Sequence, residues 1–246
     1  MIKLEQNALP DLGGFFDRFS ATKIKANELA YGFKYPFLLF WCQYIESALT
    51  AVICKFEQSV ILVTNKNADI NEIKQFINAV GFTSLEGEYE LVKTLTQKNV
   101  REYTVVFKKA TQSSLSHTPP NIKQVYEIIY GWENEHIATH EFEPFYADLT
   151  HRIRHGTAAA VLVQSSAAAI ASHITGSDAV ISGVATIPNK QGKGLGRAAL
   201  ETLEQNLVGR NIFASADSGV LDFYLKSGYI KKYKIAICEY EEKPLC

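Results

Sequence analysis

The chain has 246 residues, of which 47% are hydrophobic and 21% are charged, so it can bury the core of one large domain or of two small ones. The formal net charge of −1 argues against bulk affinity for nucleic acid or for an anionic membrane surface. No apolar run is long enough for a transmembrane helix, and the first residues lack the pattern of a signal peptide.

The cysteines carry a further indication about location. Cys42, Cys54, Cys238 and Cys246 have neither the C-x-x-C spacing of a metal or redox site nor the density of a disulfide framework. They predict reduced thiols, and therefore a location in the cytoplasm. We expect no nucleic-acid partner and no membrane association, and the sequence leaves the oligomeric state open.

Residues 1–112 are expected to form a smaller α/β domain of their own. The expected strands are Tyr35–Trp41, Ala51–Cys54, Ser59–Val63, Glu90–Leu95 and Tyr103–Lys108. A short helical segment is expected at Leu12–Phe19, and an amphipathic helix at Asn71–Val80, capped by Asn71 and closed by Gly81. This domain is either a degenerate copy of the second half of the chain or an unrelated domain that covers the substrate.

Residues 113–121 are expected to link this domain to a second one at 122–246. The linker is polar, rich in Ser and Thr, and ends in Pro119-Pro120, which excludes a helix and favours an extended path. The helices expected beyond it are Ile122–Tyr130, Pro144–His155, Gly194–Val208 and Val220–Lys226. The expected strands are Ala158–Gln164, Ala167–Ile174, Val180–Ile187, Asn211–Ser215 and a last segment, Ile230–Cys238, which is one bent strand or a strand pair.

The most informative stretch is Val184–Arg197, where a strand, a glycine-rich turn and a helical pattern follow one another. Pro188 stops the strand because it has no N–H to give to a ladder, and a helical repeat of apolar residues starts at Leu195. At such a junction several unpaired N–H groups and the helix dipole point to one place, and glycine lets the backbone approach an anion. The stretch therefore predicts a phosphate site.

Two common phosphate motifs do not describe this turn. The sequence has no Walker A string, and a dinucleotide fingerprint that starts at Gly192 fails because its sixth position is Arg197. Asp217 lies at a tolerable distance for a ribose carboxylate, which keeps a Rossmann interpretation barely open.

The turn does match the pattern Q/R-x-x-G-x-G/A, through Gln191, Gly194 and Gly196. This pattern resembles the pyrophosphate loop of the GCN5-related N-acetyltransferases (GNAT), which bind acetyl-CoA. Upstream, V-A-T-x-P resembles the fourth strand of that family, and downstream, Phe223–Tyr229 resembles its F-Y-x-K-x-G-F helix end. The resemblance covers residues 120–240 and implies an α/β (α+β) fold, a mixed sheet with a bulged central strand that is flanked by helices.

The resemblance also implies where acetyl-CoA binds. The pyrophosphate is expected on the N–H groups of Gly192–Arg197, with Lys193 and Arg197 as charge partners. The central strand is expected to pair with the pantetheine arm and to offer the acetyl carbonyl an N–H near Ala185–Thr186. The implied cofactor-binding residues are Val184, Ala185, Thr186, Gln191, Gly192, Lys193, Gly194, Leu195, Gly196, Arg197 and Asp217.

Two residues near the helix end are singled out. Tyr224 matches the family's tyrosine near the CoA sulfur, which implies a catalytic acid that protonates the departing thiolate. The alternative is an aromatic residue that packs a short helix onto the sheet. Asp217 departs from the asparagine that often holds the pantetheine, and an ionised aspartate can accept hydrogen bonds but not donate them.

The catalytic base has no single candidate. The central strand has no glutamate at Val180–Gly183, where the family often places one. The candidates lie in the loop that should overhang the acceptor, and they are Glu133, Glu135, His136, His140, Glu141 and Glu143. A water chain is an equal alternative, and each of these residues can equally be a solvated side chain. The pairs His136/His140 and His151/His155 have H-x-x-x-H spacing, but no cysteine stands nearby and no metal is expected.

Two functions follow from these expectations. The first is an acetyl-CoA-dependent N-acetyltransferase that acts on a primary amine of a small molecule or a peptide. The second is a non-catalytic acyl-CoA-binding protein of the same fold that keeps the cofactor loop without a base. The acidic and aromatic stretch Trp132–Glu143 hints at a cationic acceptor.

Overall fold

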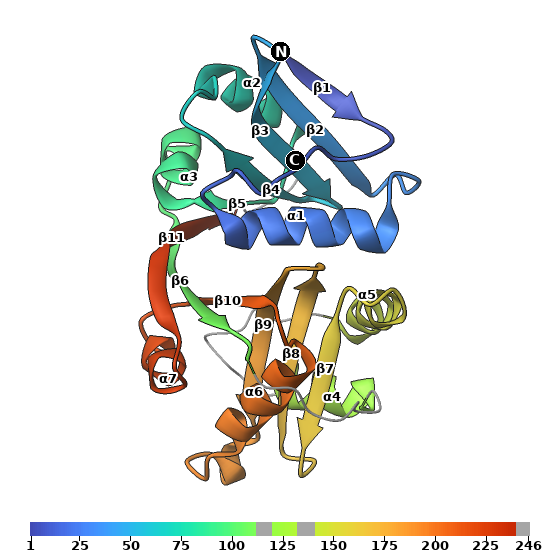
Figure 1. Cartoon of the computed structure of the whole chain (residues 1–246), viewed down its shortest axis with the longest axis vertical. Helices are drawn as coiled ribbons and strands as arrows, with labels where there is room; N and C mark the ends of the chain where they lie inside the picture. Colours follow the sequence, from blue (N-terminus) through green and yellow to red (C-terminus); the bar gives the residue numbers. More distant parts are fainter. Residues whose placement is uncertain (112–119, 132–140, 240–246) are drawn as a thin grey trace, which may run out of the picture. The chain divides into compact units, whose positions relative to one another are not determined.

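The computed structural model describes residues 1–111, 120–131 and 141–239 (Figure 1). Contacts within the chain divide it into two compact units, which are described separately below. The first unit comprises Met1–Tyr103 and the described residues from Tyr233 on, and the second comprises Thr104–Lys232. Of the expected linker, the described residues include Pro120 and Asn121 alone.

The first unit is built on a mostly antiparallel sheet. Its strands are β1 (Ile2–Glu5), β2 (Leu38–Ile45), β3 (Ala48–Phe56), β4 (Ser59–Thr64), β5 (Ser84–Glu88) and the later part of β11 (Ile230–Glu239), in the order β1-β2-β3-β4-β5-β11. Neighbouring strands are antiparallel except for β4 and β5, which are parallel. The expected strand Ser59–Val63 is confirmed by β4, whereas β1 and β5 were not predicted.

Helices cover both faces of this sheet (Figure 1). They are α1 (Arg18–Tyr31), α2 (Ile70–Val80) and α3 (Tyr89–Thr96). Val52 and Cys54 of β3 point into the core with α1, while Ala51 and Ile53 point into the core with α2 and α3. Because β3 is buried on both sides, its apolar residues are continuous instead of alternating.

Two predictions for this unit are wrong. A helix begins at Arg18 and continues to Tyr31, whereas the sequence predicted a short one at Leu12–Phe19. The boundary is set by Asp17, whose side chain accepts a hydrogen bond from the backbone N–H of Ser20. The expected strand Glu90–Leu95 lies in α3, because its apolar side chains have helical spacing and are buried on one side of that helix.

The helix α2 agrees with its prediction except at its first residue. Gly81, at φ 70°, closes the helix as expected. Its N-terminus is capped by Asp69, which accepts a hydrogen bond from the N–H of Glu72, and not by Asn71.

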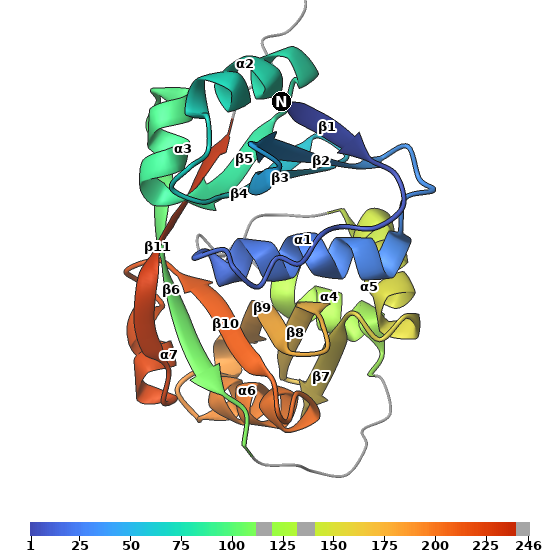
Figure 2. The same ribbon diagram turned by 45° about the horizontal axis from the view of Figure 1, so that its top comes forward.

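The second unit has a five-strand order, β6-β10-β9-β8-β7 (Figure 2). Its strands are the later part of β6 (Arg101–Lys109), β7 (Ala159–Val163), β8 (Ala167–Ile174), β9 (Asp178–Thr186) and β10 (Asn211–Ala216). Its helices are α4 (Ile122–Tyr130), α5 (Phe142–Arg154), the 3-10 turn η1 (Pro188–Lys190), α6 (Leu195–Asn206) and α7 (Leu221–Lys226). β9 and β10 are parallel, and the other neighbours are antiparallel. The structure confirms the predicted mixed sheet flanked by helices.

Alanines on β8 bring the helices of this unit close to the sheet. Ala169 and Ala171 point into a core with α6, and Ala168 points into the opposite core with α4. Because alanine projects little from the strand, the helix axes can approach the sheet closely on both sides. The predicted helix Ile122–Tyr130 and the predicted strand Ala167–Ile174 are confirmed residue for residue by α4 and β8.

The division between the two units falls inside strands. It lies between Tyr103 and Thr104 within β6 and between Lys232 and Tyr233 within β11. The expected domains 1–112 and 122–246 stay a prediction, because most of the linker between them lies outside the described residues. β11 is a single strand, which decides between the two alternatives for Ile230–Cys238. Among the described helices, none is long and apolar enough to cross a membrane.

Asp17 is a buried carboxyl group at the start of α1. Its Oδ1 accepts hydrogen bonds from the N–H of Ser20 at 3.0 Å and from the hydroxyl of Tyr233 at 3.0 Å. Its Oδ2 is covered by protein and has no hydrogen-bond partner among the described residues. Burial is the main cause that raises the pKa of Asp17 above its usual value. The folded chain therefore keeps this proton at a pH at which the unfolded chain has released it.

The change Asp17→Asn keeps the shape and an acceptor for Ser20 and Tyr233 but removes the ionisation. We expect the free energy of unfolding of the wild type to fall, relative to that of Asp17→Asn, as the pH rises from about 4 towards the raised pKa. The difference should change by at most about 1.4 kcal/mol per pH unit, and urea denaturation at several pH values measures it. Asp69→Asn, at the exposed cap of α2, is the matched control for losing a capping carboxylate. A difference that does not vary with pH contradicts the prediction.

Candidate active site

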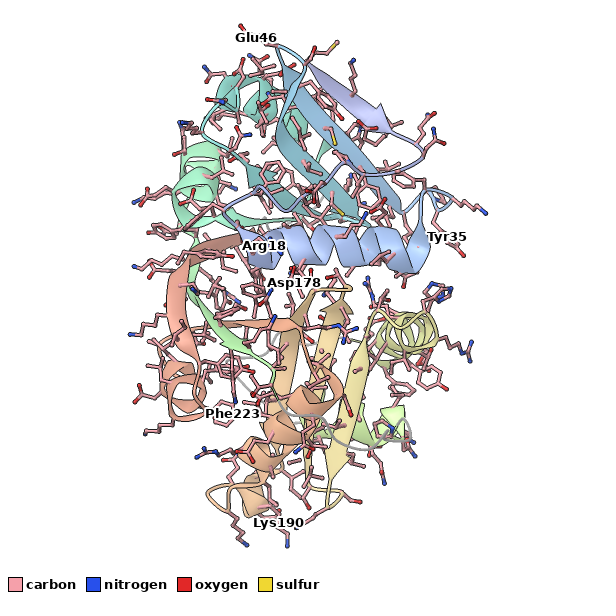
Figure 3. The ribbon with its side chains drawn as sticks, viewed as in Figure 1. Arg18, Tyr35, Glu46, Asp178, Lys190 and Phe223 are labelled. Atoms are coloured by element: carbon pink, nitrogen blue, oxygen red, sulfur yellow. The ribbon has the colours of Figure 1, made fainter. Side chains whose placement is uncertain are left out.

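The glycine-rich turn lies between the end of β9 and the start of α6. Gly192 has φ 72° and Gly194 has φ 78°, a left-handed conformation that residues with a Cβ rarely adopt. Gly194 is the N-cap residue of α6, and no side chain caps this helix. Figure 3 marks Lys190 in the turn that leads to it and Phe223 on α7. The structure therefore has the predicted order of strand, glycine turn and helix.

The first turn of α6 presents backbone donors. The first hydrogen bond of the helix is donated by the N–H of Ala198 to the carbonyl of Gly194, at 3.0 Å. The N–H groups of Leu195, Gly196 and Arg197 precede it and have no acceptor within the helix. These donors and the helix dipole favour an anion at this end of the helix. The cationic side chains nearby are exposed, and Arg197 pairs with Glu201 at 3.0 Å.

Thr186 holds the turn against the end of β9. The side-chain amide of Gln191 donates to the carbonyl of Thr186 at 3.2 Å. A Cβ at Gly196 would lie 3.1 Å from Oγ1 of Thr186 and 4.0 Å from Cε2 of Phe223. The last residue of β9, the first turn of α6 and the helix α7 thus converge at Gly196.

β9 separates from β10 on the way to this point. Their pairing runs from Asp178–Asn211 to Ile181–Ala214 and ends there within the described residues, although β9 continues to Thr186. On its other side β9 pairs with β8, and the register shifts so that Ser182 has no counterpart. The edge of β9 that follows this bulge is open towards β10, and Val184, Ala185 and Thr186 on it are half-buried.

The predicted bulge of the central strand lies before the segment where the N–H donor is expected. Ala185 and Thr186 of that segment pair in register with Ala168 and Ala167 of β8. Two irregularities lie close together: Ser182 of β9, beside Gly183, and Ser172 of β8 have no counterpart in this pairing. A Cβ at Gly183 would come within 3.3 Å of Ile129, so this part of β9 packs tightly under α4.

Asp217 follows β10 and shapes the turn into α7. Its Oδ1 accepts hydrogen bonds from the N–H of Gly219 at 2.8 Å and of Val220 at 3.1 Å. The side chain therefore acts as an acceptor, in line with its chemistry as a carboxylate.

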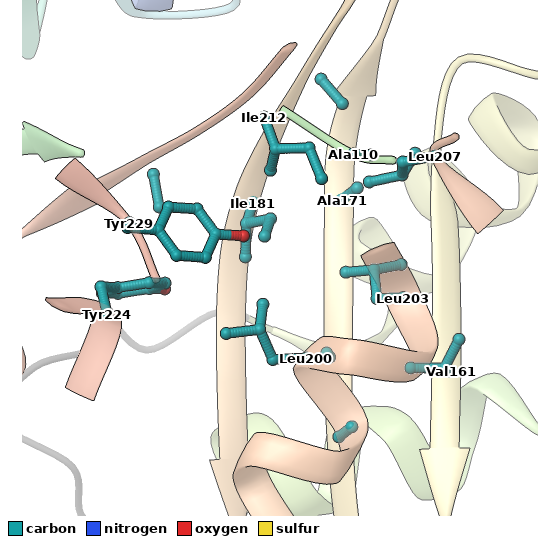
Figure 4. Packing of buried hydrophobic residues seen from close by; sticks show 14 of the residues in the cluster. Ala110, Val161, Ala171, Ile181, Leu200, Leu203, Leu207, Ile212, Tyr224 and Tyr229 are labelled. Carbon is teal, nitrogen blue, oxygen red and sulfur yellow. The ribbon is translucent and has the colours of Figure 1, made fainter. Parts of the chain in front are cut away.

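Tyr224 of α7 is buried, with 7% of its surface exposed, in a core cluster that also contains Tyr229 and Leu200 (Figure 4). Its ring meets the ring of Tyr229 at 5.3 Å and an angle of 72°, which is an edge-to-face contact. Burial raises the pKa of the Tyr224 phenol well above its usual value, so the hydroxyl keeps its proton. The ring of Tyr224 therefore packs in the core, as the alternative to a catalytic role predicts. The catalytic role of its hydroxyl stays a prediction.

The candidate bases are only partly described. Glu133, Glu135, His136 and His140 lie outside the described residues. Glu141 and Glu143 are exposed at the start of α5. The rings of His151 and His155 stack at 4.2 Å, and the described residues contain no group of three or more side chains that could hold a metal ion.

Two clusters escaped the sequence analysis. One is an aromatic cluster on α4 and α5, with ring centroids 5.1 to 5.6 Å apart, formed by Tyr126, Tyr130, Phe142, Phe145 and Tyr146. The other joins Lys108, Glu204 and Tyr229 by hydrogen bonds. The four-residue spacing of Tyr126 and Tyr130 was a signal for the first cluster, whereas the second brings Lys108 to Glu204, 96 positions away, and Glu204 to Tyr229, 25 positions away.

Comparison with known proteins bears on this geometry. The family model described as "Acetyltransferase (GNAT) domain" matches residues 128–237, which include the glycine turn and Tyr224. Among solved structures, the chain is similar to a GCN5-related N-acetyltransferase from Kribbella flavida, with 14% identity and a TM-score of 0.59, over 95% of this chain and 98% of that one.

Two further solved structures are similar. One is a GCN5-related N-acetyltransferase from Sphaerobacter thermophilus, with 12% identity and a TM-score of 0.55, over 83% of this chain and 81% of that one. The other is a putative acetyltransferase from Pyrococcus horikoshii, with 9% identity and a TM-score of 0.51, over 98% of this chain and 89% of that one. Comparison with curated proteins finds no match.

Residues 128–237 match the model of a GNAT acetyltransferase domain, and the resemblance of the sequence to this family is confirmed over that part of the chain. The activity that this family supports in general is the transfer of an acetyl group from an acyl-CoA donor. The solved structures, all at low identity, establish the fold alone.

The contact between Gly196 and Thr186 predicts a coupling between these positions. In the wild type, Gly196→Ala must push Oγ1 of Thr186 away, whereas after Thr186→Ala the new methyl group has room. We expect Gly196→Ala to be more favourable by about 1 kcal/mol in the Thr186→Ala background, since contacting residues couple by roughly 0.5 to 3 kcal/mol. Urea denaturation of the two single variants and the double variant measures this. Additive effects on the free energy of unfolding contradict the close packing.

Proposed function

We propose that this chain is an acetyl-CoA-dependent N-acetyltransferase that transfers an acetyl group to a primary amine of a small molecule or a peptide. The observation that carries the proposal is the convergence at Gly196 of an uncapped helix N-terminus with the open edge of β9. A phosphate site and an unpaired strand edge side by side suit a ligand with a pyrophosphate and an extended amide-containing arm.

Each part of acetyl-CoA has a proposed partner. The pyrophosphate binds the N–H groups of Gly192–Arg197, and Lys193 and Arg197 add positive charge. The pantetheine arm adds to β9 along Val184–Thr186, and an N–H of this segment donates to the thioester carbonyl, where negative charge develops. Asp217 either accepts a hydrogen bond from an amide of the pantetheine arm or only stabilises the turn before α7.

The reaction requires two proton movements. A neutral amine attacks the thioester carbon, the C–N bond forms and the C–S bond breaks, and the amine proton passes to a base. The base is a glutamate or histidine of residues 133–143, or a water molecule. The thiolate of CoA leaves and takes a proton from the Tyr224 phenol, which is protonated near neutral pH, and solvent afterwards returns a proton to the phenol.

An amine acceptor is favoured by the surroundings of α4 and α5. The exposed carboxylates Glu127, Glu141 and Glu143 lie on the same two helices as the aromatic cluster around Tyr126. Aromatic faces and carboxylates both attract cations, so a protonated amine is drawn to this part of the domain.

One observation favours a second function, a non-catalytic acyl-CoA-binding protein. Beyond Asp178, β9 carries no carboxylate, and Asp178 is buried and bonded to Asn211 and Ser177. A domain without a base would bind the donor but not turn it over. Release of free thiol from acetyl-CoA with a panel of amines supports the enzyme, whereas binding without release supports the second function.

A cytoplasmic location is part of the proposal. Cys42, Cys54 and Cys238 are buried free thiols, which suits a reducing compartment. The proposed partners are acetyl-CoA and the amine.

The phosphate loop is tested by Gly194→Asp, which places a negative charge where the pyrophosphate should bind. We expect the Kd of acetyl-CoA, measured by calorimetry, to rise at least about tenfold, equivalent to about 1.4 kcal/mol. Gly209→Asp is the matched control, because Gly209 also has a positive φ of 81° and open space around it, and it follows the other end of α6. Equal affinities of Gly194→Asp and the wild type rule out this loop as the pyrophosphate site.

The acid is tested by Tyr224→Phe, which keeps the ring in the core and removes only the hydroxyl. If the phenol protonates the thiolate, kcat should fall roughly 10²-fold, while the Kd of acetyl-CoA changes less. The melting temperature should move little because the edge-to-face packing on Tyr229 survives. Full kcat under conditions in which chemistry is rate-limiting would leave Tyr224 with a packing role alone.

A further inference from the structure

A partly buried polar network joins three elements of the second unit. Lys108 of β6 donates to Oε2 of Glu204 at 2.6 Å and to the carbonyl of Ser227 at 3.0 Å. The hydroxyl of Tyr229 donates to Oε1 of the same carboxylate at 2.8 Å. Both oxygens of Glu204 therefore have a donor, and the network joins α6, β6 and the turn that ends α7.

Glu204 and Tyr229 are buried, where a charge is costly, whereas the side chain of Lys108 is 28% exposed. Glu204 has 9% of its surface exposed and Tyr229 has 2%. Burial, followed by the charge of Glu204, raises the pKa of Tyr229 well above its usual value, so its hydroxyl remains a donor. Replacing a buried ion pair by apolar residues is often neutral for stability, whereas removing one partner is costly. A gain in stability is therefore a weak explanation for this arrangement, and the elements that it connects suggest a different role.

Both arms of the network end at α7. Ser227 is the C-cap residue of α7, and Lys108 holds its carbonyl. Tyr229 carries the edge-to-face contact with Tyr224, and the two rings lie next to each other beside Leu200 of α6 (Figure 4). The same helix α6 begins at the glycine turn. One carboxylate therefore fixes the helix that carries Tyr224 with respect to the helix that carries the proposed phosphate loop.

We propose that Glu204 is a positioning residue for acetyl transfer, which holds the Tyr224 hydroxyl in place through Tyr229 and the end of α7 through Lys108. The inference rests on the proposed function. Glu204 itself does not touch the reactants, and it acts through the ring of Tyr224. A misplacement of a catalytic group by about 1 Å can cost up to roughly 10²-fold in rate, so the effect should be measurable.

Two variants break the two arms separately. Tyr229→Phe removes the donor to Oε1 and keeps the ring, while Glu204→Gln keeps an acceptor for Tyr229 and sets an amide N–H against the ammonium of Lys108. For each variant we expect kcat to fall about tenfold, with the KM for acetyl-CoA close to the wild-type value. Tyr233→Phe is the matched control, because it also removes a buried phenol that donates to a carboxylate, Asp17, away from this network. It should lower stability and leave kcat unchanged.

The decisive comparison is made in the Tyr224→Phe background. If the network acts through the Tyr224 hydroxyl, Tyr229→Phe should cause no further loss of kcat there. A loss of the same size in both backgrounds, or an unchanged kcat in a destabilised Tyr229→Phe, overturns the proposal. If Tyr229→Phe does not fold, the kcat of Glu204→Gln is compared in the wild-type and Tyr224→Phe backgrounds instead, with the same criteria.

A measurement without turnover separates this inference from the proposed function. In spectra of protein with isotope-labelled tyrosine rings, the Tyr224 signals, assigned with Tyr224→Phe, should shift or broaden in Glu204→Gln. Unchanged Tyr224 signals overturn the positioning role even if the enzyme is active. A wild-type protein that releases no thiol with any amine overturns the proposed function, whatever the spectra show.

Discussion

The separation of β9 from β10 is the feature on which the rest of the second unit depends. The two parallel strands pair from Asp178–Asn211 to Ile181–Ala214 and then part, and the bulge at Ser182 lies at the point of parting. An extra residue bends a strand and increases its twist, and Ser172 of the neighbouring β8 is likewise without a counterpart here. The parting leaves an edge of β9 to which the proposed pantetheine arm can add as a further strand. Without the separation, the glycine turn would be an ordinary helix start.

Small residues then bring the helix to this edge. The alanines of β8 let α6 lie close to the sheet, and Gly196 lets its first turn contact Thr186 at the end of β9. From the other side, Phe223 of α7 reaches the same glycine. The donors of the helix N-terminus and the strand edge therefore lie close together because Gly196 has no side chain, and the side chains of Thr186 and Phe223 fill the space beside it.

The sequence predicted the second unit better than the first, for physical reasons. A proline and three glycines mark the start of α6, and a regular apolar repeat runs along it. The local sequence signals therefore agree with the fold. In the first unit, α1 has a polar and weakly periodic sequence whose Ser20, Thr22 and Asn27 are nevertheless buried, and α3 is a short apolar run that fits a strand equally well. The bulge at Ser182 and the network of Glu204 arise from pairing between distant segments, which no local pattern encodes. The glycine turn and Tyr224 could be named from the sequence, but their contacts with Thr186 and Tyr229 could not.

The central claim is that acetyl-CoA binds where the glycine turn meets the open edge of β9. It is tested most directly by titrating isotope-labelled protein with acetyl-CoA and following the backbone amide signals. The account predicts that the largest changes occur at Gly192–Arg197 and Val184–Thr186, because the pyrophosphate and the pantetheine arm bond to these N–H groups. Saturable binding that leaves both segments unperturbed, or no binding at millimolar acetyl-CoA, would contradict the account.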